Sequence, residues 1–144
     1  MNLYLDTSTL VKLYVEEQVS EMVRDAVARA ELVAISAVGY LEARSAFVRR
    51  RHEGALTAGG YRRSMRDLEA DWARYLVVEV TEAILGRAAQ LAERHRLRAY
   101  DALHLASALV LKSRLAEPVI FACWDRRLER AARAEGLGVL RSAR

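Results

Sequence analysis

Apolar and polar positions follow two different periods along the chain, and the change from one to the other predicts the elements. Short apolar runs typical of buried strands occur at residues 2–5, 32–36, 76–80, 118–123 and 138–140. Between these runs, apolar residues recur every three or four positions, as in helices with one buried face. This period predicts helices at residues 8–16, 18–30, 37–53, 57–74, 82–96, 99–113 and 126–136. Strands that alternate with helices indicate an α/β fold with a parallel sheet covered on both faces.

The composition predicts one domain, residues 1–144. Hydrophobic residues make up 53% of the chain and charged residues 29%, which is enough apolar material for a core. The chain has no linker-like stretch and no internal repeat. No apolar run is long enough to span a bilayer, and the N-terminus lacks the pattern of a secretion signal, so we expect a cytoplasmic protein without a membrane contact. Cys123 is the only cysteine, which excludes an internal disulfide.

Two aspartates stand just beyond apolar strands. Asp6 ends the run "LYLD", and Asp125 follows "VIFACW" and precedes the helical stretch "RRLERAARAEG". In open parallel sheets, ligands bind beyond the carboxyl ends of the strands, where the strand order reverses. Both residues also suit a purely structural role, because aspartate caps helices and its charge favours the positive end of the helix dipole. Asp6 and Asp125 are therefore either helix caps or parts of one site at this edge.

Two further acids interrupt helical faces that are otherwise apolar. Asp101 shares a face with Leu105, and Glu42 follows apolar residues one turn before it. A buried charge without a partner is expensive. Each acid again has a simple alternative: Asp101 as an acid in the first turn of a helix, and Glu42 as an ion-pair partner of Arg44 or Arg49.

The four acids together predict a cation site if they meet in one crevice. Two carboxylates about 5 Å apart repel by roughly 3 kcal/mol at an effective dielectric constant near 20. An all-oxygen set of this kind suits Mg²⁺ or Mn²⁺ better than zinc, and no pattern of histidines or cysteines accompanies it. His104 lies one turn from Asp101, and we interpret it as an ordinary histidine on a helix face.

Basic charge is concentrated in the middle of the chain. Between Arg44 and Arg66, seven arginines stand against one acid, Glu53, so this stretch carries +6 in a chain whose net charge is +4. Two interpretations stay open. The stretch forms either a solvent-exposed helical hairpin or a surface that contacts phosphates or a protein partner.

Four segments of the sequence resemble the PIN-domain family, and more narrowly the VapC-type toxins of prokaryotic type II toxin-antitoxin modules. They are "YLDTSTLVKLY", "ISAVGYLEARSAFVRR", "LRAYDALHLASAL" and "FACWDRRLERAARAEGLGV", in the family's order and spacing. The resemblance covers essentially the whole chain. It implies a Rossmann-like α/β/α sandwich with a central parallel sheet and a Mg²⁺- or Mn²⁺-dependent endoribonuclease.

The family's acidic residues fall on the four acids already described: Asp6, Glu42, Asp101 and Asp125. The resemblance makes them the catalytic and metal-binding residues. Thr7 and Ser8 match the family's small polar pair after the first aspartate, and we expect them to hold Asp6 in place. The family commonly has Thr or Ser two residues before its last acid. Cys123 occupies that position here, and a thiol is a poorer hydrogen-bond donor than a hydroxyl.

The resemblance also implies partners. These are an RNA substrate, a cognate VapB-type antitoxin and a second copy in a homodimer. Arg44, Arg49 and Arg50 are the residues expected to contact RNA or the antitoxin. Apolar residues of the long helices are compatible with a dimer interface and equally with core packing, namely Tyr40, Phe47, Tyr61 and Trp72.

Other functions remain as alternatives. A PIN-like module could bind RNA or protein without cleaving it, although the presence of all four acids favours an enzyme. An RNA-processing PIN nuclease that is not a toxin would carry the same residues. A haloacid dehalogenase-type phosphatase would need an aspartate at the position of Ser8. A dinucleotide-binding domain would need a glycine-rich turn after the first strand.

Overall fold

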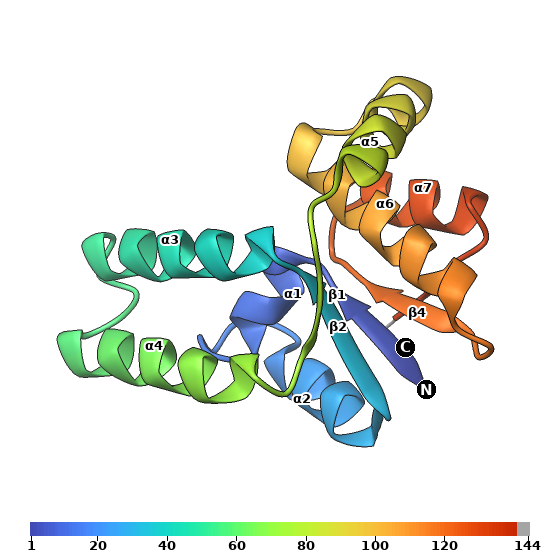
Figure 1. The fold of residues 1–144 in the computed structure, drawn as a ribbon. Helices are drawn as coiled ribbons and strands as arrows, with labels where there is room; N and C mark the ends of the chain where they lie inside the picture. Colours follow the sequence, from blue (N-terminus) through green and yellow to red (C-terminus); the bar gives the residue numbers. More distant parts are fainter. Residues whose placement is uncertain (141–144) are drawn as a thin grey trace.

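The computed structural model describes residues 1–140 and is built around a parallel sheet (Figure 1). The strands lie in the order β3-β2-β1-β4-β5, and every neighbouring pair is parallel. Their bounds are β1 (Asn2–Leu5), β2 (Leu32–Ser36), β3 (Leu76–Val78), β4 (Val119–Ala122) and β5 (Gly138–Val139). The last four residues of the expected domain lie outside the described part of the chain. The predicted α/β class and parallel sheet are confirmed.

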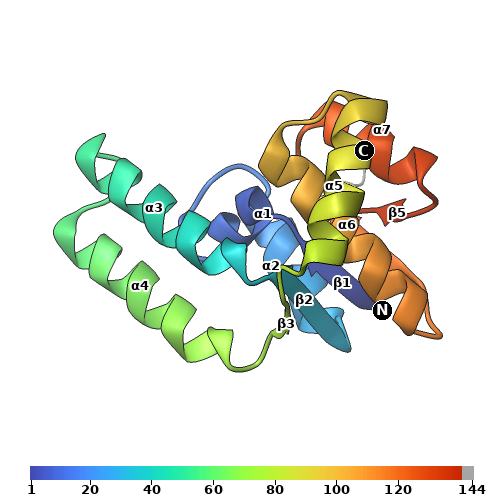
Figure 2. The same ribbon diagram turned by 45° about the horizontal axis from the view of Figure 1, so that its top comes forward.

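Helices cover both faces of this sheet (Figures 1 and 2). Their bounds are α1 (Thr7–Lys12), α2 (Ser20–Arg29), α3 (Val38–His52), α4 (Ala58–Trp72), α5 (Glu82–His95), α6 (Ala99–Arg114) and α7 (Arg126–Ala134). The alternation along β1 shows the two layers directly. Leu3 and Leu5 join the core formed with α1 to α4, whereas Tyr4 joins the core formed with α5 to α7.

The first helix is shorter than its apolar pattern predicts. It ends at Lys12 rather than near residue 16, and the chain then turns back on itself. In this turn, the carboxylate of Glu17 forms ion pairs with Lys12 at 3.2 Å and with Arg50 of α3 at 2.5 Å. Val19 closes the turn in a left-handed conformation with φ 62°. The ion pair between Glu17 and Arg50 links residues 33 positions apart in sequence, so helical periodicity gave no sign of it.

The apolar residues of the long helical pair α3 and α4 pack inward. Phe47 is completely buried, and Tyr40, Tyr61 and Trp72 pack against the same core. Core packing therefore accounts for these side chains, and a dimer interface through the long helices stays a prediction. No helix among residues 1–140 combines the length and the apolar content needed to span a membrane.

Candidate active site

Asp6 lies at the point where the strand order reverses. The chain runs from β1 to β2 on one side of β1, and β4 adds on the other side. Leu5 is opposite Ala122 in the pairing of β1 with β4, and the backbone N–H of Asp6 donates to the carbonyl of Ala122 at 3.1 Å. Asp6 thus stands between the carboxyl ends of two neighbouring strands, which is where parallel sheets bind ligands.

Three hydrogen bonds fix the Asp6 carboxylate, and all three end on Oδ1. The donors are Ser8 Oγ at 2.8 Å, the backbone N–H of Thr9 at 2.9 Å and Thr9 Oγ1 at 2.8 Å. Asp6 is therefore the cap of α1 as well as a residue of the cavity described below. Ser8 contacts Asp6 as expected. Thr9 was missed, although a capping aspartate accepts from the backbone N–H two or three positions after it, which would have pointed to Thr9.

The buried position of Asp6 disfavours its charge. The residue is 5% exposed. Burial raises the pKa of Asp6 above its ordinary value, and this effect outweighs the nearby His104 and the hydrogen bonds from Ser8 and Thr9. A cation beside this carboxylate would relieve that cost.

One cavity of about 410 Å³ collects the four predicted acids, Asp6, Glu42, Asp101 and Asp125. Asp101 projects from the first turn of α6 and is half-buried. Its pKa is raised by burial and by the charges of Asp6 and Asp125. Asp125 is exposed and caps α7, where its Oδ1 accepts from the N–H of Leu128 at 2.9 Å. The fold thus brings together four carboxylates from four separate segments.

Glu42 reaches the cavity from α3, which begins close against the sheet. A Cβ at Gly39 would lie 2.7 Å from Cγ1 of Ile35, so glycine permits this close approach of α3 to β2. Glu42 Oε1 accepts from Thr7 Oγ1 at 2.6 Å and lies 2.9 Å from His104 Nε2. Thr7 therefore holds Glu42 in place, whereas the sequence led us to expect that Thr7 would hold Asp6.

The pKa of Glu42 moves in the opposite direction from that of Asp6. Burial alone would raise it, but the hydrogen bonds from His104 and Thr7 and the charge of Arg49 hold it below its ordinary value. The surroundings of Glu42 thus favour its ionised form, in contrast to those of Asp6 and Asp101, whose pKa values are raised.

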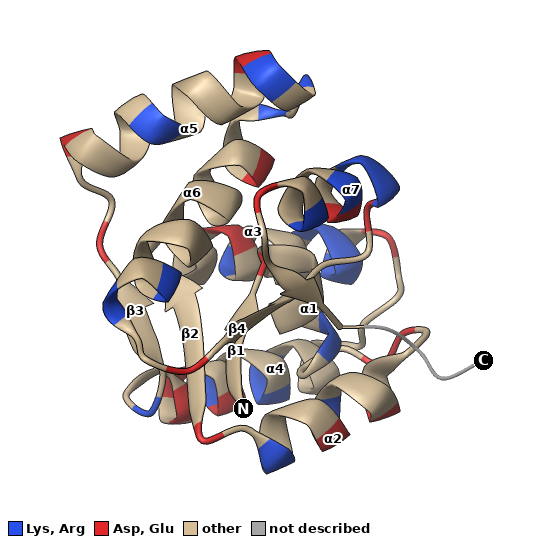
Figure 3. Cartoon of the chain, turned by 90° about the vertical axis from the view of Figure 1, so that its right-hand side faces the viewer, with Lys and Arg blue, Asp and Glu red and all other residues tan. Residues whose placement is uncertain are grey.

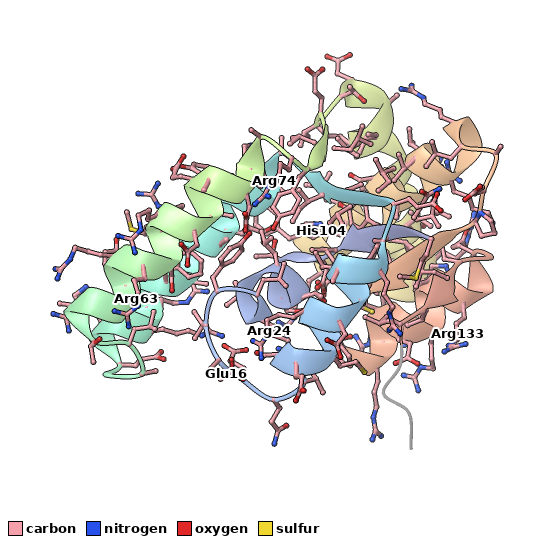
Figure 4. The ribbon with its side chains drawn as sticks, turned by 90° about the horizontal axis from the view of Figure 1, so that it is seen from below. Glu16, Arg24, Arg63, Arg74, His104 and Arg133 are labelled. Atoms are coloured by element: carbon pink, nitrogen blue, oxygen red, sulfur yellow. The ribbon has the colours of Figure 1, made fainter. Side chains whose placement is uncertain are left out.

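His104 is part of this site, and interpreting it as an ordinary histidine on a helix face was inadequate. It is 2% exposed, and Figure 4 shows it inside the molecule. Since a carboxylate only accepts, Nε2 carries the proton shared with Glu42 Oε1, and Nδ1 forms a hydrogen bond with the Tyr4 hydroxyl at 2.9 Å. Tyr4 is completely buried and stacks on Phe121 with ring centroids 5.5 Å apart. The core of the sheet thereby fixes His104, and His104 fixes Glu42.

The donor set of this cavity fits a hard divalent cation. Carboxylate oxygens are the ligands that Mg²⁺ and Mn²⁺ prefer. As the side chains are placed, no three of the histidine, cysteine, aspartate and glutamate residues within 1–140 form a group that could hold a metal ion. The four acids therefore share a cavity and a suitable chemistry, but they do not form a closed coordination cage.

Cys123 follows β4 and is buried at 1% exposure. Burial raises the pKa of the Cys123 thiol, and the charges of Asp6 and Asp125 act in the same direction. The described residues provide no hydrogen bond from this thiol to Asp125. A positioning role for Cys123 toward Asp125 therefore stays a prediction.

We expect Cys123 to be unreactive in the folded protein. A protonated, buried thiol is a poor nucleophile. Iodoacetamide at pH 8, followed by intact mass measurement, should leave the native chain unmodified and alkylate the urea-unfolded chain completely. Rapid modification of the native chain would show that this end of β4 opens to solvent.

The three predicted arginines have different positions. Arg49 and Arg50 line the cavity, and Arg50 is held there by its ion pair with Glu17. Arg44 does not line it. Its Nη1 pairs with Glu69 Oε1 at 3.1 Å, on the outer face of α3 and α4. A role for Arg44 in RNA or antitoxin contact stays a prediction.

Comparisons with known proteins agree with this architecture. A sequence model of the PIN domain matches residues 3–134. Ribonuclease VapC45 of Mycobacterium tuberculosis (strain CDC 1551 / Oshkosh) is 35% identical over 137 residues, which cover 94% of this chain and 92% of that protein. Ribonuclease VapC49 of Mycobacterium tuberculosis (strain ATCC 25618 / H37Rv) matches with the same identity and coverage.

Solved structures share the fold at lower identity. The crystal structure of FitAcB from Neisseria gonorrhoeae superposes with a TM-score of 0.65 at 19% identity, covering 96% of both chains. VapBC2 from Rickettsia felis, bound to a DNA fragment from their promoter, gives a TM-score of 0.66 at 11% identity, covering 97% of this chain and 98% of that chain.

Proposed function

The chain belongs to the PIN domain family, and from this premise we propose that its 144 residues form one PIN domain that hydrolyses RNA as the toxin of a VapBC-type toxin–antitoxin module. The observation that carries the proposal is the convergence of four carboxylates on one cavity at the switch point of the sheet. The similarity to two proteins named ribonuclease VapC, over 94% of this chain, supports the same activity.

Asp6, Glu42, Asp101 and Asp125 would hold Mg²⁺ or Mn²⁺ in this cavity. The bound ion supplies an activated water and neutralises charge that develops on the phosphate. The chain itself contributes orientation. Oδ1 of Asp6 is fixed by its three hydrogen bonds. Oε1 of Glu42 is fixed by two neighbours, which leaves Oε2 available to the cavity.

Proton transfer falls to the carboxylates. Glu42 or Asp101 accepts the proton of the attacking water, since both carboxylates line the cavity. The side chain of Arg49 is placed to bind the phosphate, because it lines the same cavity and makes no ion pair within residues 1–140. The products would carry a 5′-phosphate and a 3′-hydroxyl.

Partners follow from the same assignment. The compared structures include a toxin–antitoxin complex from Klebsiella pneumoniae and VapBC2 from Rickettsia felis. We infer a VapB-type antitoxin as the protein partner of this chain and a homodimer as its assembly. Copurification with the antitoxin encoded beside it, followed by light scattering, would test both.

Metal-dependent RNA cleavage tests the proposed activity. Purified protein should cleave total RNA with Mg²⁺ or Mn²⁺ and stop in excess EDTA, because four carboxylates without a cation repel the phosphate. Restoring the metal should restore cleavage, which excludes damage by the chelator. A folded protein that cleaves no RNA with either ion would favour a binding module without catalysis.

A further inference from the structure

A second cavity of about 330 Å³ lies beside the acidic one, and its wall is rich in arginine. Both cavities share Arg98, Asp101 and Asp125, so they are adjacent. The arginines come from the loop before α6 and from α7, where Figure 3 shows several basic positions. They are Arg96, Arg98, Arg126, Arg127 and Arg130.

These five arginines outnumber the acids of the cavity, because, of the described acids, only Asp101 and Asp125 line it beside them. All five are exposed, and none of them forms an ion pair within residues 1–140. Arg127 donates to the carbonyl of Arg96 at 3.1 Å, which ties α7 to the loop before α6. By contrast, Arg44 and Arg50 of the basic stretch are already paired with Glu69 and Glu17. Five guanidinium groups against two carboxylates leave an excess of positive charge in this cavity, which an anionic ligand would offset.

We propose that this arginine cluster binds backbone phosphates of single-stranded RNA next to the phosphate that is cleaved. The inference rests on the proposed function and adds the path of the substrate to it. A nucleic acid strand presents one anion per nucleotide. One phosphate can therefore lie at the metal-binding acids while its neighbours lie on the cluster, and guanidinium groups match phosphate oxygens bidentately.

An exposed aromatic residue precedes Asp101, which lines both cavities. Tyr100 follows Arg98 by two residues and is 54% exposed. Unpaired bases stack on such rings, with a contribution of about 1–3 kcal/mol per base in single-strand binding proteins. Tyr100 itself lines neither cavity, so the choice of RNA over an acidic peptide rests on the shared wall with the acidic cavity, where the phosphate that is cleaved would lie.

The test compares two double variants with equal loss of charge. Arg126→Gln/Arg130→Gln removes two arginines of the cluster. Arg62→Gln/Arg63→Gln removes two exposed arginines of α4, which lies on the opposite side of the molecule from α7 (Figure 4). Steady-state cleavage of one single-stranded RNA oligonucleotide should show a KM about tenfold higher for the cluster variant and a kcat within about twofold of wild type. The plot of log(kcat/KM) against log[salt] has a negative slope. For the cluster variant this slope should be less steep by about 1.4, because two phosphate contacts are lost. The α4 variant should match wild type.

Equal KM values and salt slopes for the two variants would overturn the inference. A cluster variant that binds RNA normally but loses affinity for the antitoxin would overturn it too, because the surface would then serve a protein partner. If the wild type cleaves no RNA, the proposed activity fails separately. In that case binding of a fluorescent single-stranded RNA in EDTA decides: weaker binding by the cluster variant alone supports the inference, and equal binding by both variants overturns it.

Discussion

Asp6→Asn is expected to lower RNA cleavage about a thousandfold while the fold stays intact. The substitution removes a buried negative charge from the centre of the acidic cavity, and a loss of this size equals about 4 kcal/mol of transition-state stabilisation. An asparagine Oδ1 still accepts the hydrogen bonds from Ser8 and Thr9 that cap α1. Cleavage rates and the thermal unfolding midpoint, measured on the same preparation, separate lost chemistry from lost structure.

Asp67→Asn is the matched control for this experiment. Asp67 is an exposed acid of α4 that lines neither cavity. Its neutralisation changes the net charge by the same amount, so its cleavage rate should stay within about twofold of wild type. If Asp6→Asn kept more than a tenth of the wild-type rate, the acidic cavity would not be the site of hydrolysis.

The buried Asp6 carboxylate is thus unfavourable for the fold, although the proposed metal site needs it. Burial raises the pKa of Asp6, and burial together with the charges of Asp6 and Asp125 raises that of Asp101. A sequence selected only for stability would not keep these acids together. Their convergence is therefore better explained by a ligand that brings positive charge than by helix capping alone, although Asp6 and Asp125 do cap α1 and α7.

The strand ends could be predicted from the sequence because the relevant signals are local. An apolar run followed by a carboxylate and a helix start locates Asp6 and Asp125 at one edge of a parallel sheet without knowledge of any contact. Helical periodicity likewise located Glu42 and Asp101 on inward faces. The structure places these four acids around one cavity, which is the condition under which they would form a cation site. Their catalytic roles stay a prediction until the variants are measured.

The basic surface could not be predicted in the same way. Counting arginines along the chain pointed to the stretch from Arg44 to Arg66, because charge density is a one-dimensional property. The fold pairs Arg44 with Glu69 and Arg50 with Glu17, which are 25 and 33 positions away in sequence. The arginines of the cluster beside the acidic cavity come from two segments that meet only in the folded chain, the loop before α6 and α7. A count of charge along the chain therefore could not bring them together.

His104 was underestimated for a related reason. A single histidine on an apolar helix looks like a core residue, since its partners Tyr4 and Glu42 are 100 and 62 positions away. Both nitrogens of its ring are engaged, one by the core and one by the site. His104 is therefore a positioning residue that acts through Glu42.

His104→Ala is expected to cost about 3 kcal/mol of unfolding free energy and to weaken the site. The change leaves a cavity and removes the hydrogen-bond partner of the buried Tyr4 hydroxyl, and each such loss costs about 1–3 kcal/mol. His104→Gln keeps a polar side chain and should lose about 1 kcal/mol. Urea unfolding in EDTA measures both values.

Metal affinity distinguishes positioning from a structural role alone. Loss of a side chain that orients a ligand typically weakens metal binding 10- to 100-fold, so both His104 variants should raise the Kd for Mn²⁺ at least tenfold. His95→Gln is the control. This substitution breaks the 2.8 Å contact between His95 and Glu135. Neither residue lines the acidic cavity or the arginine-rich one, so the Kd for Mn²⁺ should stay unchanged. If His104→Gln bound Mn²⁺ as tightly as wild type, His104 would stabilise the core without orienting Glu42.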